Sequence, residues 1–336
     1  MDDAEAAETF LPAAQAALAA FPVSPARIDF VNVSENVTFR VTDDDGRDFV
    51  LRLHRPWYHT LERLKGERVW TRALAAAGVA VPQGVPTREG EDYARVTVER
   101  LGEQRWAGLA RWIEGQVLFG VVESETDPAA VEAHFERLGA IMAALHNQAS
   151  AWTPPASFVR HALDADGLMG GGADKPPFWG PFWDHPIFTP GERALVLAAR
   201  DKIHAALTRL GRDPATFSLI HADLHPGNVL IDGDHLAVID FDDAAFGWHL
   251  YDLAVALVFY DEHPHFTGFR DACLRGYGAV RPPPEGAVRW LPMFWLIRRL
   301  VQVGWLQARP ELPERDDLKG RKGAILAMVE AFEPPD

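Results

Sequence analysis

The stretch that decides the fold runs from Leu219 to Asp243 and reads LIHADLHPGNVLIDGDHLAVIDFDD. It opens with His221-x-Asp223, and Asn228 follows five residues after Asp223. Two short apolar runs then flank an Asp-Gly pair, which is the pattern of a β-hairpin. An Asp-Phe-Asp run beginning at Asp240 closes the stretch. The hairpin is therefore expected to bring Asn228 and Asp240, at its two ends, close together.

These residue types fit phosphate chemistry. The amide oxygen of Asn228 and the carboxylate of Asp240 are hard oxygen ligands suited to Mg²⁺. Asp223, on the preceding loop, could accept the proton of a hydroxyl that attacks a metal-bound phosphate. Protein-kinase catalytic loops combine an aspartate base, an asparagine on metal and a second metal-binding aspartate in this way. The stretch therefore predicts Asp223, Asn228 and Asp240 as catalytic residues, with Asn228 and Asp240 as the metal ligands.

A second interpretation of the same residues is a hydrolytic metal centre. The spacing His221-x-Asp223-x-His225 resembles that of metallohydrolases, but it leaves Asn228 and Asp240 without a role. We expect His221 to support the loop by hydrogen bonding, and the role of His225 stays open.

Three more aspartates belong to the motif region. Asp252 lies on an apolar segment where burial needs a partner, so it is expected to anchor the loop. Asp242 and Asp243 either assist the metal or are solvated.

Composition limits the possible partners. The chain has 336 residues, which at roughly 150 per domain predicts about two domains. Lys and Arg number 33 against 48 Asp and Glu, giving a net charge of −15. Such a surface repels phosphate backbones and anionic membranes, so no nucleic-acid or membrane partner is expected. The chain has an acidic N-terminus, a single cysteine and no run of 18 apolar residues. These features predict a soluble cytoplasmic protein, and they leave the oligomeric state open.

Periodicity divides the chain into two parts. Alternating apolar residues predict strands over 28–33, 37–41, 49–53 and 106–114, with helices over 4–20 and 61–77. Helical spacing then dominates, over 129–147, 191–210, 247–261 and 286–308. We therefore predict an α+β chain with a small β-rich lobe, residues 1–110, and a larger mainly helical lobe, residues 111–336.

The motif with its hairpin, followed by Tyr251-Asp252-Leu253-Ala254, resembles the aminoglycoside phosphotransferase and choline kinase superfamily. The resemblance covers about residues 25–310. It is closest to the branch of homoserine-kinase-like and bacterial stress-response kinases, on the basis of Ser34-Glu35-Asn36 and the strand around Arg52. It implies a bilobal protein-kinase-like fold.

The resemblance also implies roles in nucleotide binding. The turn of Ser34, Glu35 and Asn36 would cover the phosphates, although no Gly-x-Gly-x-x-Gly is present. Arg52 occupies the position where protein kinases place a phosphate-binding lysine, and its fork differs in geometry from an ammonium. Glu67 would orient Arg52, with Glu62 as the competing candidate.

The same resemblance assigns Arg111, Trp112 and Ile113 to the hinge, where backbone groups would face the purine. The implied reaction is Mg²⁺-dependent transfer of the γ-phosphoryl group of ATP, or of GTP, to a hydroxyl of a small molecule. Two alternatives stay open: a protein Ser/Thr kinase of the stress-response type and a catalytically silent nucleotide-binding protein.

Two aromatic groups admit two interpretations each. The segment 178–184, FWGPFWD, either lines an acceptor pocket by cation–π contact or packs in the core. Trp290, Trp295 and Trp305, near Arg298 and Arg299, are expected to belong to a packed helix rather than to a ligand-binding site.

Overall fold

The computed structural model describes residues 2–33, 36–172, 174–309 and 315–335. The chain forms two compact units. The first comprises residues 1–115, 154–159 and 237–242, and the second comprises 116–153, 160–236 and 243–336. The chain thus enters the second unit after Gly115 and returns to the first for Ala237–Asp242. Asp240 therefore belongs to the first unit, whereas Asp223 and Asn228 belong to the second.

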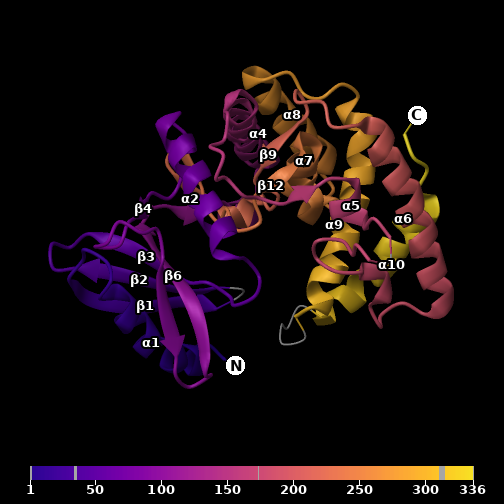
Figure 1. Ribbon diagram of the computed structural model, residues 1–336. Helices are drawn as coiled ribbons and strands as arrows, with labels where there is room; N and C mark the ends of the chain where they lie inside the picture. The colour runs from indigo at the N-terminus through magenta and orange to yellow at the C-terminus, as the bar shows by residue number, and fades with distance from the viewer. Residues whose placement is uncertain (1, 34–35, 173, 310–314, 336) are drawn as a thin grey trace. The chain divides into compact units, whose positions relative to one another are not determined.

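The first unit is an antiparallel sheet with two helices. The strand order is β1–β2–β3–β6–β4, and β5 also pairs with β6. Figure 1 shows these strands side by side, with α1 along the sheet. The elements are α1 (Asp3–Leu18), β1 (Pro25–Val33), β2 (Val37–Asp43), β3 (Asp48–Leu53), α2 (Leu61–Ala76), β4 (Gly84–Val85), β5 (Ala94–Val98) and β6 (Glu103–Arg111).

Alternation explains why one sheet face is covered. Every second residue of β2 and β3 is buried, because successive side chains of a strand point to opposite faces. These residues form one apolar cluster with Ala6, Phe10 and Ala14 of α1. On α2, Thr60 caps the N-terminus by accepting from the backbone N–H of Arg63. This arrangement places Arg52 on a central strand of a well-packed sheet.

The second unit is mainly helical. Its short strands pair as β10 with β7 and as β8–β12–β9. Among the described residues, no helix has the length and apolarity to cross a membrane. The elements are β7 (Gln116–Val117), α3 (Leu118–Ser124), α4 (Pro128–Ala151), β8 (Ala162–Leu163), α5 (Ala165–Met169), η1 (Phe182–Asp184), α6 (Pro190–Leu210), β9 (Phe217–Ile220), η2 (Pro226–Asn228), β10 (Val229–Asp232), β11 (His235–Val238, which runs on into the first unit), β12 (Ala245–Trp248), α7 (His249–Leu257), η3 (Val258–Tyr260), α8 (Phe266–Val280), α9 (Ala287–Gln307) and α10 (Arg315–Ala331).

The periodic segments are found close to their predicted bounds. The predicted hairpin is β10 and β11, and the helices predicted over 129–147, 191–210 and 286–308 are α4, α6 and α9. Helices α8 and α10 were not predicted from the sequence. Between 151 and 190, where no regular pattern was found, the chain has only short elements.

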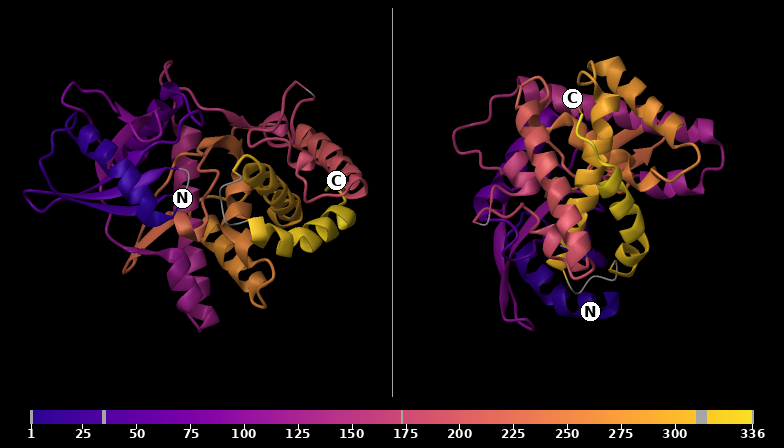
Figure 2. Two further views of the ribbon diagram at one scale, coloured as in Figure 1. Left: turned by 90° about the horizontal axis from the view of Figure 1, so that it is seen from below. Right: turned by 90° about the vertical axis from the view of Figure 1, so that its right-hand side faces the viewer.

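Helices α4 and α8 lie side by side in the second unit (Figures 1 and 2). Glycines make this approach feasible. A Cβ built on Gly276 of α8 would lie 1.7 Å from the carbonyl oxygen of Glu136 on α4. A Cβ on Gly139 of α4 would lie 2.0 Å from the carbonyl oxygen of Cys273. The two backbones are therefore in direct contact, and this contact fixes the helices that carry His146 and Tyr277.

Gly276→Ala should destabilise the protein by about 1–3 kcal/mol, because backbone atoms on both sides must move apart. Gly278→Ala on the same helix is the matched control: its Cβ would meet only Pro283, at 3.8 Å. Alanine in an open helical position is favoured over glycine by about 1 kcal/mol. Urea unfolding followed by circular dichroism should therefore separate the two variants, and equal midpoints would contradict the close contact.

Candidate active site

The loop that begins the motif is anchored by a buried carboxylate. Asp252 on α7 accepts two hydrogen bonds from successive backbone N–H groups, from His221 at 3.0 Å and from Ala222 at 2.7 Å. His146 of α4 lies with its Nε2 3.0 Å from the same carboxylate, and its Nδ1 is 2.9 Å from the Tyr277 hydroxyl. The anchoring role expected for Asp252 is confirmed, and His146 is a partner that the sequence did not reveal.

Backbone strain is concentrated at this motif. Among the described residues, the non-glycine residues with positive φ are Trp57, Ala222 and Asp240, at 67°, 68° and 65°. Ala222 directly precedes Asp223, and Asp240 is itself a predicted metal ligand. A strained φ persists only where surrounding contacts hold it, and such residues cluster at functional sites. At Ala222 the holding contact is the Asp252 carboxylate.

Asp252→Asn should destabilise the protein by about 1–3 kcal/mol, because an NH₂ group would face backbone N–H donors. Burial raises the pKa of Asp252 from 3.8 to about 6. The folded protein therefore binds this proton more tightly than the unfolded chain, and the resulting stability is lost as the pH rises through 6.

The difference in unfolding free energy between wild type and Asp252→Asn should consequently be larger at about pH 5 than at about pH 7.5. Urea titrations of both proteins at the two pH values measure this difference. A difference that does not change with pH would contradict the raised pKa of Asp252.

The second unit brings Asp223 and Asn228 together. Asn228 Nδ2 donates to Asp223 Oδ2 at 3.0 Å and to its carbonyl oxygen at 2.9 Å. The other carboxylate oxygen, Oδ1, forms an ion pair with Arg298 Nη2 from α9. His225 Nε2 lies 3.5 Å from Oδ2. Burial alone would raise the pKa of Asp223, but Arg298 and His225 hold it below its usual range. Asp223 is therefore an ionised group with a fixed orientation.

The side-chain oxygen of Asn228 is compatible with binding to a hard cation. Both contacts of its side chain to Asp223 use the NH₂ group, and no described residue donates to its Oδ1. An amide oxygen oriented in this way is the type of ligand that Mg²⁺ takes.

The first unit brings Arg52 and Asp240 together. Arg52 Nη1 lies 3.0 Å from Asp240 Oδ1, and the Asp240 side chain is 37% exposed. Burial would lower the pKa of Arg52, but the carboxylates of Asp240, Glu67 and Asp242 raise it. Glu67 is buried on α2, and its Oε2 has no hydrogen-bond partner among the described residues. The direct partner of Arg52 in this structure is thus Asp240, and orientation by Glu67 stays a prediction.

Asn36 links the predicted phosphate-covering turn to the end of the motif. Its Nδ2 donates to Asp242 Oδ2 at 2.9 Å, and its Oδ1 accepts from the Arg55 backbone N–H at 3.0 Å. His54 Nδ1 lies 3.6 Å from Asp242 Oδ1. Burial would raise the pKa of Asp242, but His54 and Arg52 lower it. Asp242 is therefore a buried, partnered anion. Ser34 and Glu35, the other predicted residues of this turn, lie outside the described residues.

Asn36→Ala should destabilise the first unit by about 1–3 kcal/mol, because it removes a donor from a buried carboxylate and an acceptor from a backbone N–H. Asn36→Ser, which retains a small polar group, should lose less. Thermal unfolding of both variants measures the effect. If the alanine variant were as stable as wild type, Asn36 would not be needed to hold Asp242.

Two backbone N–H groups of the predicted hinge form hydrogen bonds within the first unit. The backbone N–H of Arg111 donates to the carbonyl oxygen of Gln83 at 2.9 Å, and that of Trp112 donates to the backbone carbonyl oxygen of Asp48 at 3.0 Å. The Trp112 ring also lies beneath the Arg40 guanidinium, 4.6 Å from the ring centre. The contact of Arg111, Trp112 and Ile113 with a purine stays a prediction.

The aromatic segment 178–184 packs into the second unit. Trp179 and Phe182 are buried, and His161 stacks on Phe178 with ring centroids 3.7 Å apart. Trp179 in turn stacks against Tyr251 of α7 at 6.4 Å. Of the two interpretations, core packing accounts for these contacts. On α9, Trp290 is likewise buried, as expected for a packed helix.

The described residues do not provide the ligands that the alternative, a hydrolytic metal centre, would need. Among the described residues, no three His, Cys, Asp or Glu side chains are grouped so that they could hold a metal ion. His221 Nδ1 instead accepts from the Asp223 backbone N–H at 3.2 Å, which fits its expected supporting role. His225 Nδ1 accepts in the same way from Gly227, at 3.0 Å.

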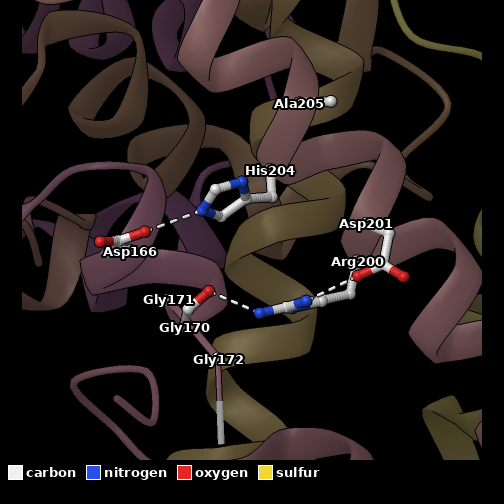
Figure 3. A pocket seen from close by; sticks show the side chains of 8 residues that line it. All are labelled: Asp166, Gly170, Gly171, Gly172, Arg200, Asp201, His204 and Ala205. Atoms are coloured by element: carbon white, nitrogen blue, oxygen red, sulfur yellow. Dashed lines mark hydrogen bonds and ion pairs between the residues drawn. The ribbon is translucent and has the colours of Figure 1, made fainter. Parts of the chain in front are cut away.

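A separate polar pocket of about 300 Å³ lies between α5 and α6 (Figure 3). None of the predicted site residues lines it. Its polar groups bind one another: His204 Nε2 lies 2.8 Å from Asp166, and Arg200 donates to the carbonyl oxygens of Met169 and Gly170. These contacts connect the segment around Gly170 to α6.

Comparisons with known proteins show the family of the chain. A model of the phosphotransferase enzyme family matches residues 30–291, most of the chain. The chain belongs to this family. An amicoumacin kinase from Bacillus subtilis is 23% identical over 305 residues, which is 86% of this chain and 82% of that protein. A homoserine kinase from Parvibaculum lavamentivorans is 28% identical over 230 residues, which is 66% of this chain and 61% of that kinase.

A solved structure extends the similarity to the fold. The microcompartment-associated aminopropanol kinase superposes with a TM-score of 0.79 at 30% identity, covering 95% of each chain. The resemblance inferred from the motif is thereby confirmed, as are the protein-kinase-like fold and the prediction of an enzyme of the small-molecule kinase type.

Proposed function

We propose that this phosphotransferase moves the γ-phosphoryl group of ATP to a hydroxyl of a small molecule in a Mg²⁺-dependent reaction. The observation that carries the proposal is the fixed Asp223 carboxylate on the strained, anchored loop, bound on one oxygen by Asn228 and on the other by Arg298. In phosphoryl transfer, catalysis is mainly positioning and charge stabilisation, so a fixed anion that orients the hydroxyl is the group the reaction needs.

Each residue has a role in this proposal. Asp223 accepts the hydrogen bond of the acceptor hydroxyl and takes its proton as the new phosphate ester forms. The proposed metal ligands are the Asn228 amide oxygen and the Asp240 carboxylate, and a bound Mg²⁺ would neutralise phosphate charge. Arg52 carries the cation that protein kinases supply with lysine, and it can fork onto phosphate oxygens. GTP is the alternative donor.

A small-molecule acceptor is favoured over a protein. The similar proteins are named for amicoumacin, homoserine and aminopropanol, and none of these is a protein. The sequence also contains no Ala-Pro-Glu segment after Asp240 such as protein kinases carry.

The proposal is tested by ADP and GDP release with Mg²⁺ over a panel of aminoglycosides, choline, ethanolamine, homoserine and a generic protein. Wild type should show acceptor-dependent release. Asp223→Asn should lose about 10²- to 10⁴-fold in turnover, because the hydroxyl loses its proton acceptor. Its affinity for ATP should be unchanged, since Asp223 is not proposed to touch the nucleotide.

Asp240→Ala should instead abolish the Mg²⁺-dependent rise in melting temperature that nucleotide gives wild type. Wild-type turnover in this variant would contradict the metal assignment. Nucleotide binding by wild type without turnover of any acceptor, the generic protein included, would favour the silent nucleotide-binding alternative.

A further inference from the structure

Arg298 is a buried cation next to the proposed catalytic carboxylate. It comes from α9, 75 residues after Asp223 in the chain, and is 8% exposed. Its Nη2 pairs with Asp223 Oδ1, while Asn228 holds Oδ2. A carboxylate bound on both oxygens cannot rotate about its Cβ–Cγ bond without breaking one contact. The orientation of Asp223 is therefore set jointly by its own loop and by α9.

Helix α9 is a rigid support for this contact. Its Gly304 touches the segment around Gly180 so closely that an added Cβ would lie 2.7 Å from the Gly180 carbonyl oxygen. The neighbouring Arg299 binds both carboxylate oxygens of Asp261 at 2.8 Å and the carbonyl oxygen of Val258 at 2.9 Å. The position of Arg298 is thus fixed by backbone packing and by an adjacent ion pair.

We propose that Arg298 is a positioning residue, which orients the Asp223 carboxylate toward the acceptor hydroxyl and acts on the reaction through Asp223 alone. The inference rests on the proposed function, because it assigns a role within the same site. Its physical basis is that reacting groups must be held within a fraction of an ångström of productive geometry by neighbours that are themselves locked. An arginine suits this role because its planar fork binds carboxylate with defined geometry and it does not lose its proton.

Arg299 is the matched control. It lies next to Arg298 on the same helix, is equally buried at 8%, and also pairs with an aspartate, but its partner Asp261 has no role in the proposed mechanism. Replacing either arginine leaves a half-buried carboxylate without its arginine. The two replacements should therefore cost similar stability and differ in catalysis.

The experiment compares Arg298→Gln, Arg298→Lys and Arg299→Gln by steady-state ADP release with an acceptor that wild type uses. Arg298→Gln should lower kcat by about 10- to 100-fold, while KM for ATP stays within about twofold, because an interaction that acts in the transition state is lost. Arg298→Lys should recover part of the loss, since the charge remains. Arg299→Gln should keep kcat within about threefold of wild type.

A double-mutant cycle tests whether Arg298 acts through Asp223. In the Asp223→Asn background, adding Arg298→Gln should reduce the residual rate by less than about threefold, because residues that act as a unit are not additive. A full additional loss in this background would overturn the inference, as would an Arg298→Gln variant with wild-type kcat. An equal loss of kcat in Arg299→Gln would show a structural effect and would also overturn it. The absence of acceptor-dependent turnover in wild type would instead refute the proposed function.

Discussion

The capture of two successive backbone N–H groups by the Asp252 carboxylate is the interaction on which the rest of the site depends. Ala222 lies in the left-handed region at φ 68°, and the hydrogen bond from its N–H to Asp252 helps to hold this strained conformation. Asp252 has no exposed surface, and burying a carboxylate is unfavourable unless donors surround it. The two N–H groups supply such donors, and His146 Nε2 lies 3.0 Å from the same carboxylate. The loop and the helices therefore stabilise each other, and Asp223 receives its position from both.

The path of the chain explains why one short stretch of sequence contains three of the predicted site residues. Asp223 and Asn228 precede the hairpin in the second unit, whereas Asp240 follows it in the first. The 25-residue stretch thus supplies predicted site residues to both units. In the first unit, Asp240 contacts Arg52, which lies 188 positions earlier, and Asp242 contacts Asn36, which lies 206 positions earlier. Along the chain, a single hairpin therefore separates the predicted motif residues of the second unit from those of the first.

Local pattern was sufficient to predict most of the longer elements and the motif, but not α8, α10 or the long-range partners. Alternation in β2 and β3 and an Asp-Gly turn are encoded within a few residues, so strands and hairpin were found near their observed bounds. Arg298 is different: its partner lies 75 residues away, and the pattern of α9 indicated only a packed helix. The available signal was two adjacent arginines in an otherwise apolar helix, since buried charges require partners. The partner of Glu67 could not be predicted either, because the position of a carboxylate on a helix does not determine which cation it contacts.

In each unit an arginine forms an ion pair with an aspartate of the motif. Arg52 pairs with Asp240 in the first unit, and Arg298 pairs with Asp223 in the second. In the proposed reaction Asp223 must stay ionised to accept a hydrogen bond, although burial favours the neutral carboxyl group. Arginine meets this requirement better than lysine, because burial can remove the proton of a lysine ammonium but not that of a guanidinium. Arg52 therefore need not be a weakened substitute for the kinase lysine: one face of its fork binds Asp240, and donors remain for phosphate oxygens.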